Sequence, residues 1–595
     1  MEIQKPFKNE DVAIFVHWSK DSFLEETTLS YVTELSIACK YVLFVSNSPL
    51  DPKEINKLKN MGVMYHQRDN IGFDFWGWKE GISVIEEKVK KASNLILCNS
   101  SCYLAFNSLS TLLSKMNEEA DIWGITGFKD KKIPFHLQSY FLVFKKRVLT
   151  DWNVFSHFWN TLPKINNWND AVKLGELRLT AFYSKKGFRC RALVDPATLP
   201  SSDINPSIYY PVELFLNGSP LLKKKIFTED YGKYLHNSYG NIPSLSLNYV
   251  KENRGNYRQI LRSLIKHESP TKLIFTLHLN FIIGKENIEN KKRTNVAVIC
   301  YVYYEDMTNY ISEILNRFVG IADIVVVSPK TKLLESYQAL FANSRTSIDY
   351  RFQMNRGRNE AAFFVTCKDV WQKYEYVCVL HDKKTSHAKP ALLGMDFMKH
   401  CELNLCPSPD SIKEILNTFQ NNPLLGLLVP PVPFFGKFIP SVLNPLGRNL
   451  TSISSLNQKV FSGTLFSSRE EIDAFSAPFG GMFWARSEAL ISLTNSNLRI
   501  ADFPKEPLKS SDGTILHAIE RCYPMVARKS GFYTGRVINI NQISVLYDNQ
   551  LYFNARMKIT EKILFFVVEF IKKKLCDYPR LYEAMKFIYK KFFSL

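Results

Sequence analysis

The feature that most constrains this chain is an internal repeat, because two long segments show the same order of apolar runs. The first segment has runs at 12–16, 41–45 and 95–98, and the second has them at 296–301, 323–327 and 376–380. Helical patterns separate the runs. Short apolar strands that alternate with helices are typical of a parallel sheet covered by helices. We therefore predict two α/β lobes with Rossmann-like, mainly parallel sheets. The alternative is a chance likeness of two such segments.

The length of 595 residues is enough for three or four ordinary domains, or for two large ones with additions. Residues 201–293 are rich in Pro, Asn and Lys and have helical character at 257–267. The predicted organisation is a first lobe at 1–200, a connector with helical segments at 201–293, a second lobe at 294–548 and an amphipathic, basic helical tail at 549–595.

The net charge of +19 predicts an anionic partner, which could be nucleic acid, a nucleotide-linked substrate or an anionic membrane. The basic residues form no basic arm and no repeat with aromatic residues, which disfavours nucleic acid. The 11 cysteines are scattered and lack zinc-site spacing, so we expect reduced thiols in a cytosolic protein. No apolar run is long enough to span a bilayer, and the first residues do not form a secretory signal.

The order of elements resembles that of nucleotide-sugar-dependent glycosyltransferases of the GT-A type, in particular the large inverting family that builds bacterial polysaccharides. The resemblance implies a loop that holds the nucleoside, an Asp-x-Asp that carries a divalent metal, and a helix acid that deprotonates the acceptor hydroxyl. Residues 175–180 match this last element, and Glu176 is the candidate base. The alternative for Glu176 is a solvated acid in a first helical turn, favoured by the helix dipole.

The first lobe departs from this pattern where the metal ligands are expected. Residues 99–101 are Asn-Ser-Ser, and neutral groups bind Mg²⁺ or Mn²⁺ poorly. The lobe could take its acid from Asp69 or Asp74. We favour the other interpretation, in which it works without a metal and uses basic residues of the run Lys145-Lys146-Arg147.

Longer motifs resemble the rhamnan synthesis protein F family and cover most of 10–200 and 294–545. The motifs lie at 69–75, 98–101, 121–126, 136–141, 356–359, 381–386, 481–486 and 512–521. The resemblance implies a cytoplasmic glycosyltransferase, peripheral on the inner face of the bacterial cytoplasmic membrane. It would extend a lipid-linked cell-surface polysaccharide, such as O-antigen, lipopolysaccharide or capsule. The implied donor is dTDP-rhamnose or a related nucleotide sugar. The donor-binding candidates of the first lobe are His17, Asp69, Asn70, Gly72, Asp74, Asn99, His136 and Gln138.

The second lobe places charged residues at the end of a predicted strand, the usual ligand position in an open α/β sheet. The donor-binding candidates here are Arg356, Asn359, His381, Asp382, Lys383, Lys384, His387, Trp484, His517 and Arg521. Asp382 is also a candidate metal ligand. The alternatives are a basic surface loop after the strand and a core position for Trp484.

Asp512 and Glu520 are further catalytic candidates, although Asp512 could instead cap the helix that starts near Gly513. Either lobe or both could transfer sugar. The alternative for the whole chain is a non-catalytic scaffold that binds sugars or nucleotides.

The tail combines an apolar stripe at helical spacing with the lysine runs 572–574 and 590–591. Such a helix suits an anionic membrane surface, where a lipid-linked acceptor would be found. The alternative is a helix that packs on the second lobe.

Overall fold

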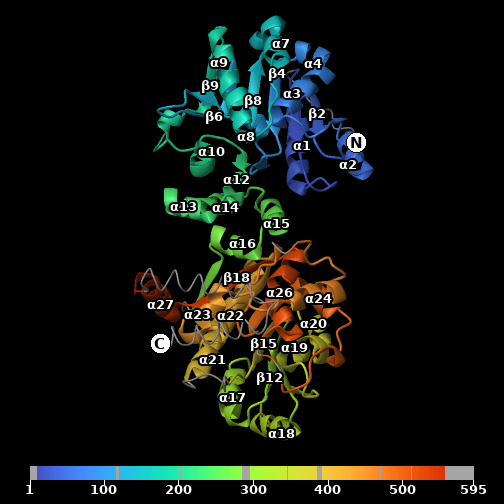
Figure 1. The fold of residues 1–595 in the computed structure, drawn as a ribbon, viewed down its shortest axis with the longest axis vertical. Helices are drawn as coiled ribbons and strands as arrows, with labels where there is room; N and C mark the ends of the chain where they lie inside the picture. The colour runs from blue at the N-terminus through green and yellow to red at the C-terminus, as the bar shows by residue number, and fades with distance from the viewer. Residues whose placement is uncertain are drawn as a thin grey trace, which may run out of the picture. The chain divides into compact units, whose positions relative to one another are not determined.

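The computed structural model describes residues 10–115, 119–201, 203–284, 295–344, 346, 348–384, 392–468, 471–508, 510 and 512–556. The chain divides into two compact units, Met1–Leu264 and Ile265–Leu595. Each unit contains an α/β lobe (Figure 1). The predicted tail helices beyond 556 and the candidate His387 lie outside the described residues.

The first unit is built on a sheet with the strand order β3-β2-β1-β4-β8-β6, in which β7 and β9 both pair with β6. Strand β8 is antiparallel to both of its neighbours, whereas β3, β2, β1 and β4 are parallel, as are β6 and β9. The strands are β1 (Val12–His17), β2 (Tyr41–Ser46), β3 (Met64–Gln67), β4 (Asn94–Asn99), β6 (Ile122–Phe128), β7 (His136–Leu137), β8 (Phe141–Lys145) and β9 (Cys190–Val194).

The second unit repeats this topology. Its sheet has the order β14-β13-β12-β15-β17-β16-β18-β11, with β17 antiparallel to both neighbours. Strand for strand, the first seven match β3-β2-β1-β4-β8-β6-β9, which confirms the predicted repeat of mainly parallel lobes. The strands are β11 (Asn280–Ile283), β12 (Val296–Tyr301), β13 (Asp323–Ser328), β14 (Ile348–Phe352), β15 (Tyr376–His381), β16 (Leu425–Val429), β17 (Phe483–Arg486) and β18 (Tyr533–Asn539).

Helices cover both faces of the first sheet, because successive side chains of a buried strand point to opposite faces. Ile14 packs in one core with helices α3, α4, α7 and α9, and Phe15 packs in the other with α1, α2 and α5. These helices are α1 (Glu26–Ala38), α2 (Pro52–Asn60), α3 (Phe73–Val84), α4 (Glu86–Lys91), α5 (Leu109–Ser114), α7 (Trp152–Asn160) and α9 (Arg178–Lys185).

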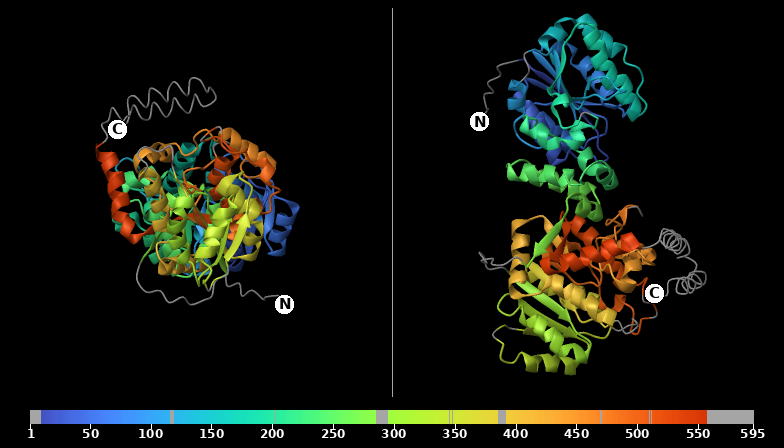
Figure 2. Two further views of the ribbon diagram at one scale, coloured as in Figure 1. Left: turned by 90° about the horizontal axis from the view of Figure 1, so that it is seen from below. Right: turned by 90° about the vertical axis from the view of Figure 1, so that its left-hand side faces the viewer.

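The second sheet is layered in the same way (Figure 2). Ile299 shares a core with helices α19, α20, α24 and α26. Helix α18 packs beside β13, α21 beside β18 and α22 beside β11. These helices are α18 (Thr331–Leu340), α19 (Arg358–Ala361), α20 (Lys368–Lys373), α21 (Leu392–Leu405), α22 (Pro409–Asn421), α24 (Leu450–Phe461) and α26 (Ile515–Lys529).

Residues 201–293 are shared between the two units. The short strand β10 (Leu221–Lys223) pairs with β5 (Cys102–Leu104) of the first lobe, and β11 is the edge strand of the second sheet. The helix predicted at 257–267 is α15 (Tyr257–His267). The other helices of this segment are α10 (Pro206–Tyr209), α11 (Pro211–Leu216), α12 (Lys225–Thr228), α13 (Tyr231–Asn237), α14 (Ile242–Glu252) and α16 (Pro270–Thr276).

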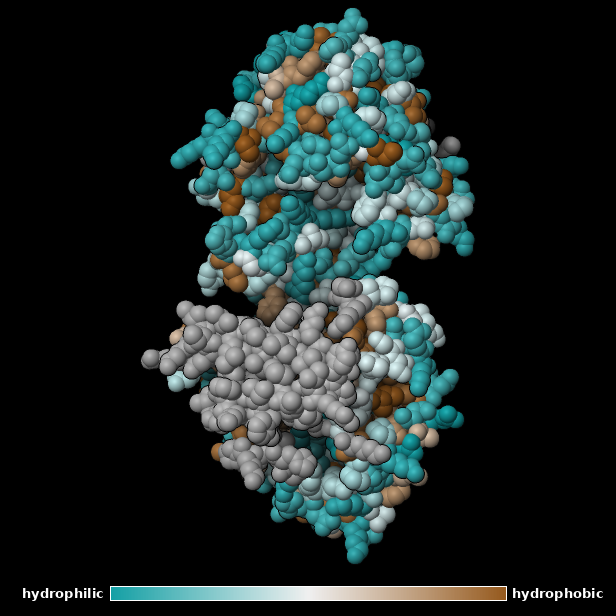
Figure 3. Space-filling model, in the orientation of Figure 1, coloured by the Kyte–Doolittle hydropathy of each residue, from teal (hydrophilic) through white to brown (hydrophobic). Residues whose placement is uncertain are grey.

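Hydrophilic side chains cover most of the described surface that faces the viewer in Figure 3. None of the helices in the described part of the chain is long and apolar enough to cross a membrane.

Candidate functional site

A chain of hydrogen bonds lies at the carboxyl edge of the first sheet, where β4 ends. Lys223 Nζ donates to Ser101 Oγ at 3.0 Å, and Ser101 Oγ donates to Asn99 Oδ1 at 2.5 Å. Asn99 Nδ2 donates in turn to Asp74 Oδ2 at 2.7 Å. Three segments far apart in sequence therefore meet here, and an ammonium group is linked to a carboxylate through two neutral side chains.

Glu176 lies in the same cluster, since its charge raises the pKa of Asp74. Its Oε1 accepts hydrogen bonds from the backbone N–H of Ser139 at 2.8 Å and from Ser139 Oγ at 2.6 Å. The side chain is 19% exposed. It is therefore not a solvated acid of a first helical turn. It belongs to a π-helical segment, Ala171–Leu177, that continues into α9, and π-helical turns often mark functional sites.

The close packing of this helix requires a glycine beside the glutamate. A Cβ at Gly175 would lie 2.4 Å from the ring of Phe75 in α3. The segment that carries Glu176 is therefore held directly against the helix that carries Asp74.

Asp74 follows a tight turn at the start of α3. Gly72 has φ 74° and Phe73 has φ 54°, so two consecutive residues adopt left-handed conformations. Burial raises the pKa of Asp74 to about 6, although Lys223 and Asn99 act in the opposite direction. Asp69 and Asn70 are exposed in the preceding loop.

Three further candidates of the first lobe are buried. His17 ends β1, with Nδ1 3.2 Å from Ser46 Oγ, and burial lowers its pKa to about 4. His136 has Nδ1 3.1 Å from the carbonyl of Pro134, so Nδ1 carries a proton, and its Nε2 lies 4.0 Å from Glu176 Oε2. Gln138 donates from Nε2 to Asn205 at 3.0 Å.

Lys145, Lys146 and Arg147 were expected to supply positive charge here, and that expectation is wrong. Lys145 ends β8, and Lys146 and Arg147 follow it directly. Because β8 runs antiparallel to β4, all three lie at the opposite edge of the sheet. Arg147 pairs there with Asp121 at 3.1 Å. A cation that does lie at the site is Lys223, which the sequence shows only as part of a lysine run in the expected connector.

In the second lobe, the strand equivalent to β4 ends in His381, followed by Asp382. Asp382 Oδ2 accepts hydrogen bonds from the backbone N–H groups of Tyr303 and Tyr304, each at 2.7 Å. Its Oδ1 is buried without a hydrogen-bond partner in the described structure. Burial raises the pKa of Asp382 to about 6, against the effect of the two N–H donors.

His381 is held by two carbonyl oxygens, those of Asp382 at 2.8 Å and Gly480 at 2.6 Å, and burial lowers its pKa. Lys383 Nζ lies 4.5 Å from the centroid of the Phe397 ring. Lys384 forms an ion pair with Asp306.

Glu520 occupies the place in the second lobe that Glu176 occupies in the first. Its Oε1 accepts a hydrogen bond from the backbone N–H of Gly480 at 3.4 Å. By the registers of β8 on β4 and of β17 on β15, Gly480 corresponds to Ser139. The two lobes thus share one arrangement: a helix glutamate bound to the backbone just before the antiparallel strand. The sequence singled out both glutamates but gave no sign that they correspond.

Residues 355–359 form the counterpart of the Asp74 loop, with Gly357 at φ 80° and Arg358 at φ 46°. Arg356 donates from Nε to the carbonyl of Phe503 at 2.5 Å and from Nη2 to that of Ala501, so it holds a loop. Asn359 donates to the buried Glu360 at 3.0 Å. Sequence reasoning missed Glu360, which also accepts a hydrogen bond from Tyr523 and whose pKa burial raises strongly.

Asp512 does not cap α26, whose N-cap is Thr514. Its carboxylate instead accepts hydrogen bonds from Arg448 N at 3.0 Å and Asn449 Nδ2 at 2.6 Å, at the start of α24. Asp512 therefore has a structural role in this loop.

Two residues of α26 lie around these groups. Arg521 lies 3.8 Å from Asp512 and 3.6 Å from Glu520, and its Nε donates to the carbonyl of Pro445 at 2.9 Å. His517 has Nδ1 2.8 Å from Thr514 Oγ1, and burial lowers its pKa.

Trp484 does not lie at the site. Its side chain is 0% exposed, Nε1 donates to the carbonyl of Leu405 at 2.9 Å, and the ring stacks on Phe318. The core interpretation is therefore correct for Trp484, and it is removed from the donor-binding set.

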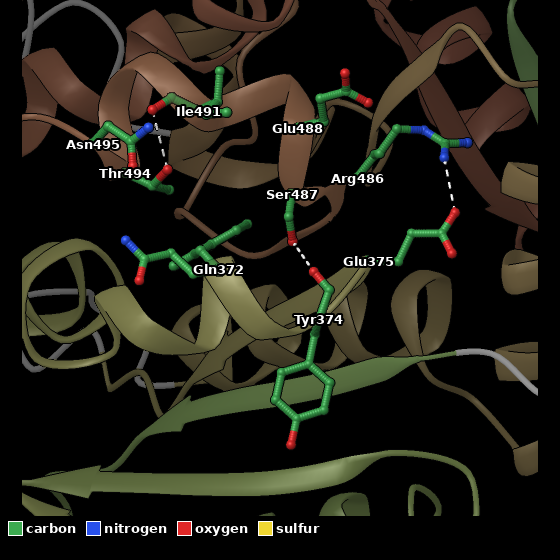
Figure 4. A pocket seen from close by; sticks show the side chains of 10 residues that line it. Gln372, Tyr374, Glu375, Arg486, Ser487, Glu488, Ile491, Thr494 and Asn495 are labelled. Atoms are coloured by element: carbon green, nitrogen blue, oxygen red, sulfur yellow. Dashed lines mark hydrogen bonds and ion pairs between the residues drawn. The ribbon is translucent and has the colours of Figure 1, made fainter.

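An open concavity of about 550 Å³ lies elsewhere on the second lobe (Figure 4). It is lined by residues just before β15 and by residues at and after the end of β17, including Glu375 and Arg486, which pair at 3.2 Å. Because β17 runs antiparallel to β15, both ends lie at the amino edge of the parallel strands, opposite the candidate site.

The described residues include no group of three or more His, Cys, Asp or Glu side chains that could hold a metal ion. In the first lobe, Asn99 Oδ1 already accepts hydrogen bonds from Ser101 N and Oγ. In the second lobe, Asp382 offers one unpartnered oxygen.

Two mainly parallel sheets, each with a helix glutamate and polar side chains at its carboxyl edge, define a tandem α/β protein with one candidate ligand site in each lobe. The chain belongs to the rhamnan synthesis protein F family, whose model matches residues 42–532.

Curated relatives share parts of the chain. The uncharacterized protein y4gN of Sinorhizobium fredii (strain NBRC 101917 / NGR234) is 28% identical over 189 residues, which are 31% of this chain and 49% of that protein. The uncharacterized protein WxcX of Xanthomonas campestris pv. campestris (strain B100) is 27% identical over 257 residues, 42% of this chain and 33% of that protein. The chain thus spans half or less of the length of these relatives.

Among solved structures, the apo-form glycosyltransferase GlyE of Streptococcus pneumoniae TIGR4 is 10% identical, with a TM-score of 0.24, over 69% of this chain and 99% of that chain.

Proposed function

We propose that this protein is a glycosyltransferase that moves a sugar from a nucleoside diphosphate to a growing lipid-linked polysaccharide. Membership of the rhamnan synthesis protein F family supports polysaccharide synthesis. The observation that carries the proposal is the glutamate placed in the same way at the carboxyl edge of both sheets. L-Rhamnose carried by dTDP is the first donor to test.

In the proposed reaction, Glu176 is the general base. Its Oε1 is held by Ser139, which leaves Oε2 to accept the proton of the acceptor hydroxyl. The hydroxyl oxygen then bonds to the anomeric carbon while the bond from that carbon to the diphosphate oxygen breaks. The nucleoside diphosphate leaves with the electron pair, and the configuration at the anomeric carbon inverts. Glu520 has the equivalent role in the second lobe.

The test is an assay of the purified full chain with a panel of nucleotide sugars, starting with dTDP-L-rhamnose, and a lipid-linked saccharide acceptor. With the second lobe inactivated by Glu520→Gln, the further change Glu176→Gln should lower transfer by about 10²–10⁴-fold. Glutamine keeps the Oε1 acceptor for Ser139, so the fold should not change. Glu87→Gln, at a residue 76% exposed on α4, is the matched control.

Undiminished transfer by the Glu176→Gln, Glu520→Gln double variant would contradict the proposed bases. Nucleotide-sugar binding without transfer from any donor would favour a non-catalytic scaffold.

The proposal places the enzyme at the inner face of the cytoplasmic membrane, bound through the basic tail. Co-sedimentation with liposomes that contain anionic lipid should be weaker for a chain that ends at residue 556 than for the full chain, and the difference should shrink at high salt. Equal binding by both chains would remove the tail from this role.

A further inference from the structure

Lys223 reaches the first site from outside the first lobe's α/β fold. It is the last residue of β10, which pairs antiparallel with β5, and it lies opposite Cys102 in that pair. This pairing delivers an ammonium group to the end of β4, where it donates to Ser101 Oγ at 3.0 Å. Its Nζ also lies 4.7 Å from the centroid of the buried Tyr140 ring.

The charge of Lys223 acts on the groups around it. It lowers the pKa of Asp74 and that of the Cys102 thiol, in each case against the effect of burial. An ammonium group has three N–H donors, and Ser101 accepts one of them. The remaining donors are suited to the oxygens of a phosphate group, which Lys binds as a point charge.

Asn99, at the metal-ligand position of the resembling enzymes, is unsuited to a divalent cation. Asn99 Oδ1 is committed to Ser101, and Asn99 Nδ2 is a donor directed at Asp74. A metal ion at the end of β4 would also face the positive charge of Lys223 at close range. Where the resembling enzymes have an Asp-x-Asp, this chain therefore has the neutral residues Asn99 and Ser101, and Ser101 accepts a hydrogen bond from the ammonium group of Lys223.

We propose that Lys223 is the cation that binds the diphosphate of the donor in the first lobe, in place of a divalent metal ion. This inference rests on the proposed function for the identity of the ligand as a nucleoside diphosphate. It assigns to residues 221–223 a direct part in the site, although they lie outside the lobe predicted at 1–200.

The test is calorimetric titration of the full chain with dTDP and with UDP, in buffer with MgCl₂ and in buffer with EDTA. The titrations use a Lys383→Met background, in which we expect weaker binding to the second lobe, so that the remaining binding reports on the first. We expect EDTA to change the Kd by less than twofold. Lys223→Met should raise the Kd at least tenfold, whereas Lys223→Arg, which keeps the charge, should retain most of the affinity.

Lys233→Met is the matched control, because Lys233 is an exposed lysine of the same segment that pairs with Glu229. It should change the Kd by less than twofold. The EDTA comparison uses no change at position 223, so the inference can be tested even if Lys223→Met disturbs folding.

Binding that is lost in EDTA, or equal affinity in Lys223→Met and its parent, would overturn the inference and leave the proposed function standing. Metal-independent binding that requires Lys223, without sugar transfer from any donor, would support the inference and overturn the proposed activity. Failure of both diphosphates to bind in either buffer would overturn both.

Discussion

At the scale of single residues, the clearest sign of the repeat is a pair of left-handed residues that opens the helix after the third strand of each lobe. The pairs are Gly72 with Phe73 and Gly357 with Arg358. A non-glycine residue at positive φ is uncommon, so its recurrence at one place in both lobes shows that the same turn is built twice. The glycines could be matched from the sequence, but Phe and Arg have no preference for this conformation that would have revealed it.

Gly357→Ala should destabilise the second unit for two reasons. An alanine here would have to adopt an unfavourable φ of 80°. Its Cβ would also lie 2.5 Å from the Cβ of Ala361. We expect a loss of about 2–4 kcal/mol in the free energy of unfolding, measured by urea denaturation. Gly320→Ala has a similar φ of 77° with no atom within 4 Å, so it should cost only about 1 kcal/mol. Equal losses in the two variants would contradict the predicted clash.

Asp74→Asn should stabilise the protein at neutral pH. The folded pKa of about 6 lies above the ordinary value of 3.8, so the native state binds the proton more tightly than the unfolded state does. The stabilisation that comes from protonated Asp74 is complete below about pH 4, and it is lost as the pH rises through about 6 and the carboxyl group ionises. Asparagine can still accept the hydrogen bond from Asn99 and carries no charge.

The advantage of Asp74→Asn should therefore grow from pH 4 to pH 7.5, to about 2–3 kcal/mol at most. Urea denaturation of both proteins at several pH values measures it. A difference that does not vary with pH would show that Asp74 has an ordinary pKa in the folded protein.

Trp484→Phe tests the corrected position of this tryptophan. The change removes the N–H that binds the buried carbonyl of Leu405, so the free energy of unfolding should fall by about 1–3 kcal/mol. The affinity for a nucleoside diphosphate should not change, because the ring lies in the core. Weaker binding at unchanged stability would restore the sugar-stacking interpretation.

At the scale of elements, the sequence predicts the parallel strands well and their partners poorly. Apolar runs mark β1, β2, β4, β12, β13 and β15, because a strand buried on both faces must be apolar throughout. Strand direction has no such signature, and for this reason Lys145 was placed at the wrong edge. The strands β10 and β5 are three residues long and lie more than 100 positions apart in the sequence. No local sequence pattern reveals that they pair.

Leu222→Ala should weaken the attachment of β10. Leu222 is 0% exposed and is the middle residue of β10, where it lies opposite Tyr103 of β5. We therefore expect a loss of about 2–5 kcal/mol in the free energy of unfolding. The affinity for a nucleoside diphosphate should fall as well, because β10 carries Lys223. The control Leu216→Ala, at a residue 69% exposed, should cost about 0.5 kcal/mol or less. If Leu222→Ala leaves stability unchanged, β10 does not hold the segment in place.

At the scale of the whole molecule, the described residues of each unit form hydrophobic cores of their own. Leu222 belongs to the first unit and Gly357 to the second. The destabilisation in a Leu222→Ala, Gly357→Ala double variant should therefore equal the sum of the single effects within about 0.5 kcal/mol, measured by calorimetry of each unfolding transition. A larger deviation would show energetic coupling between the units.

The attachment of β10 to the first lobe also sets a rule for exchanging lobes between relatives. A graft that stops at residue 200 would transplant the sheet and Glu176 without Lys223, and the imported site would depend on whatever segment the host supplied. A graft that runs to Leu264 would carry its own cation. The smallest interchangeable module is therefore longer than the α/β fold, and recombination breakpoints compatible with function should fall after this segment.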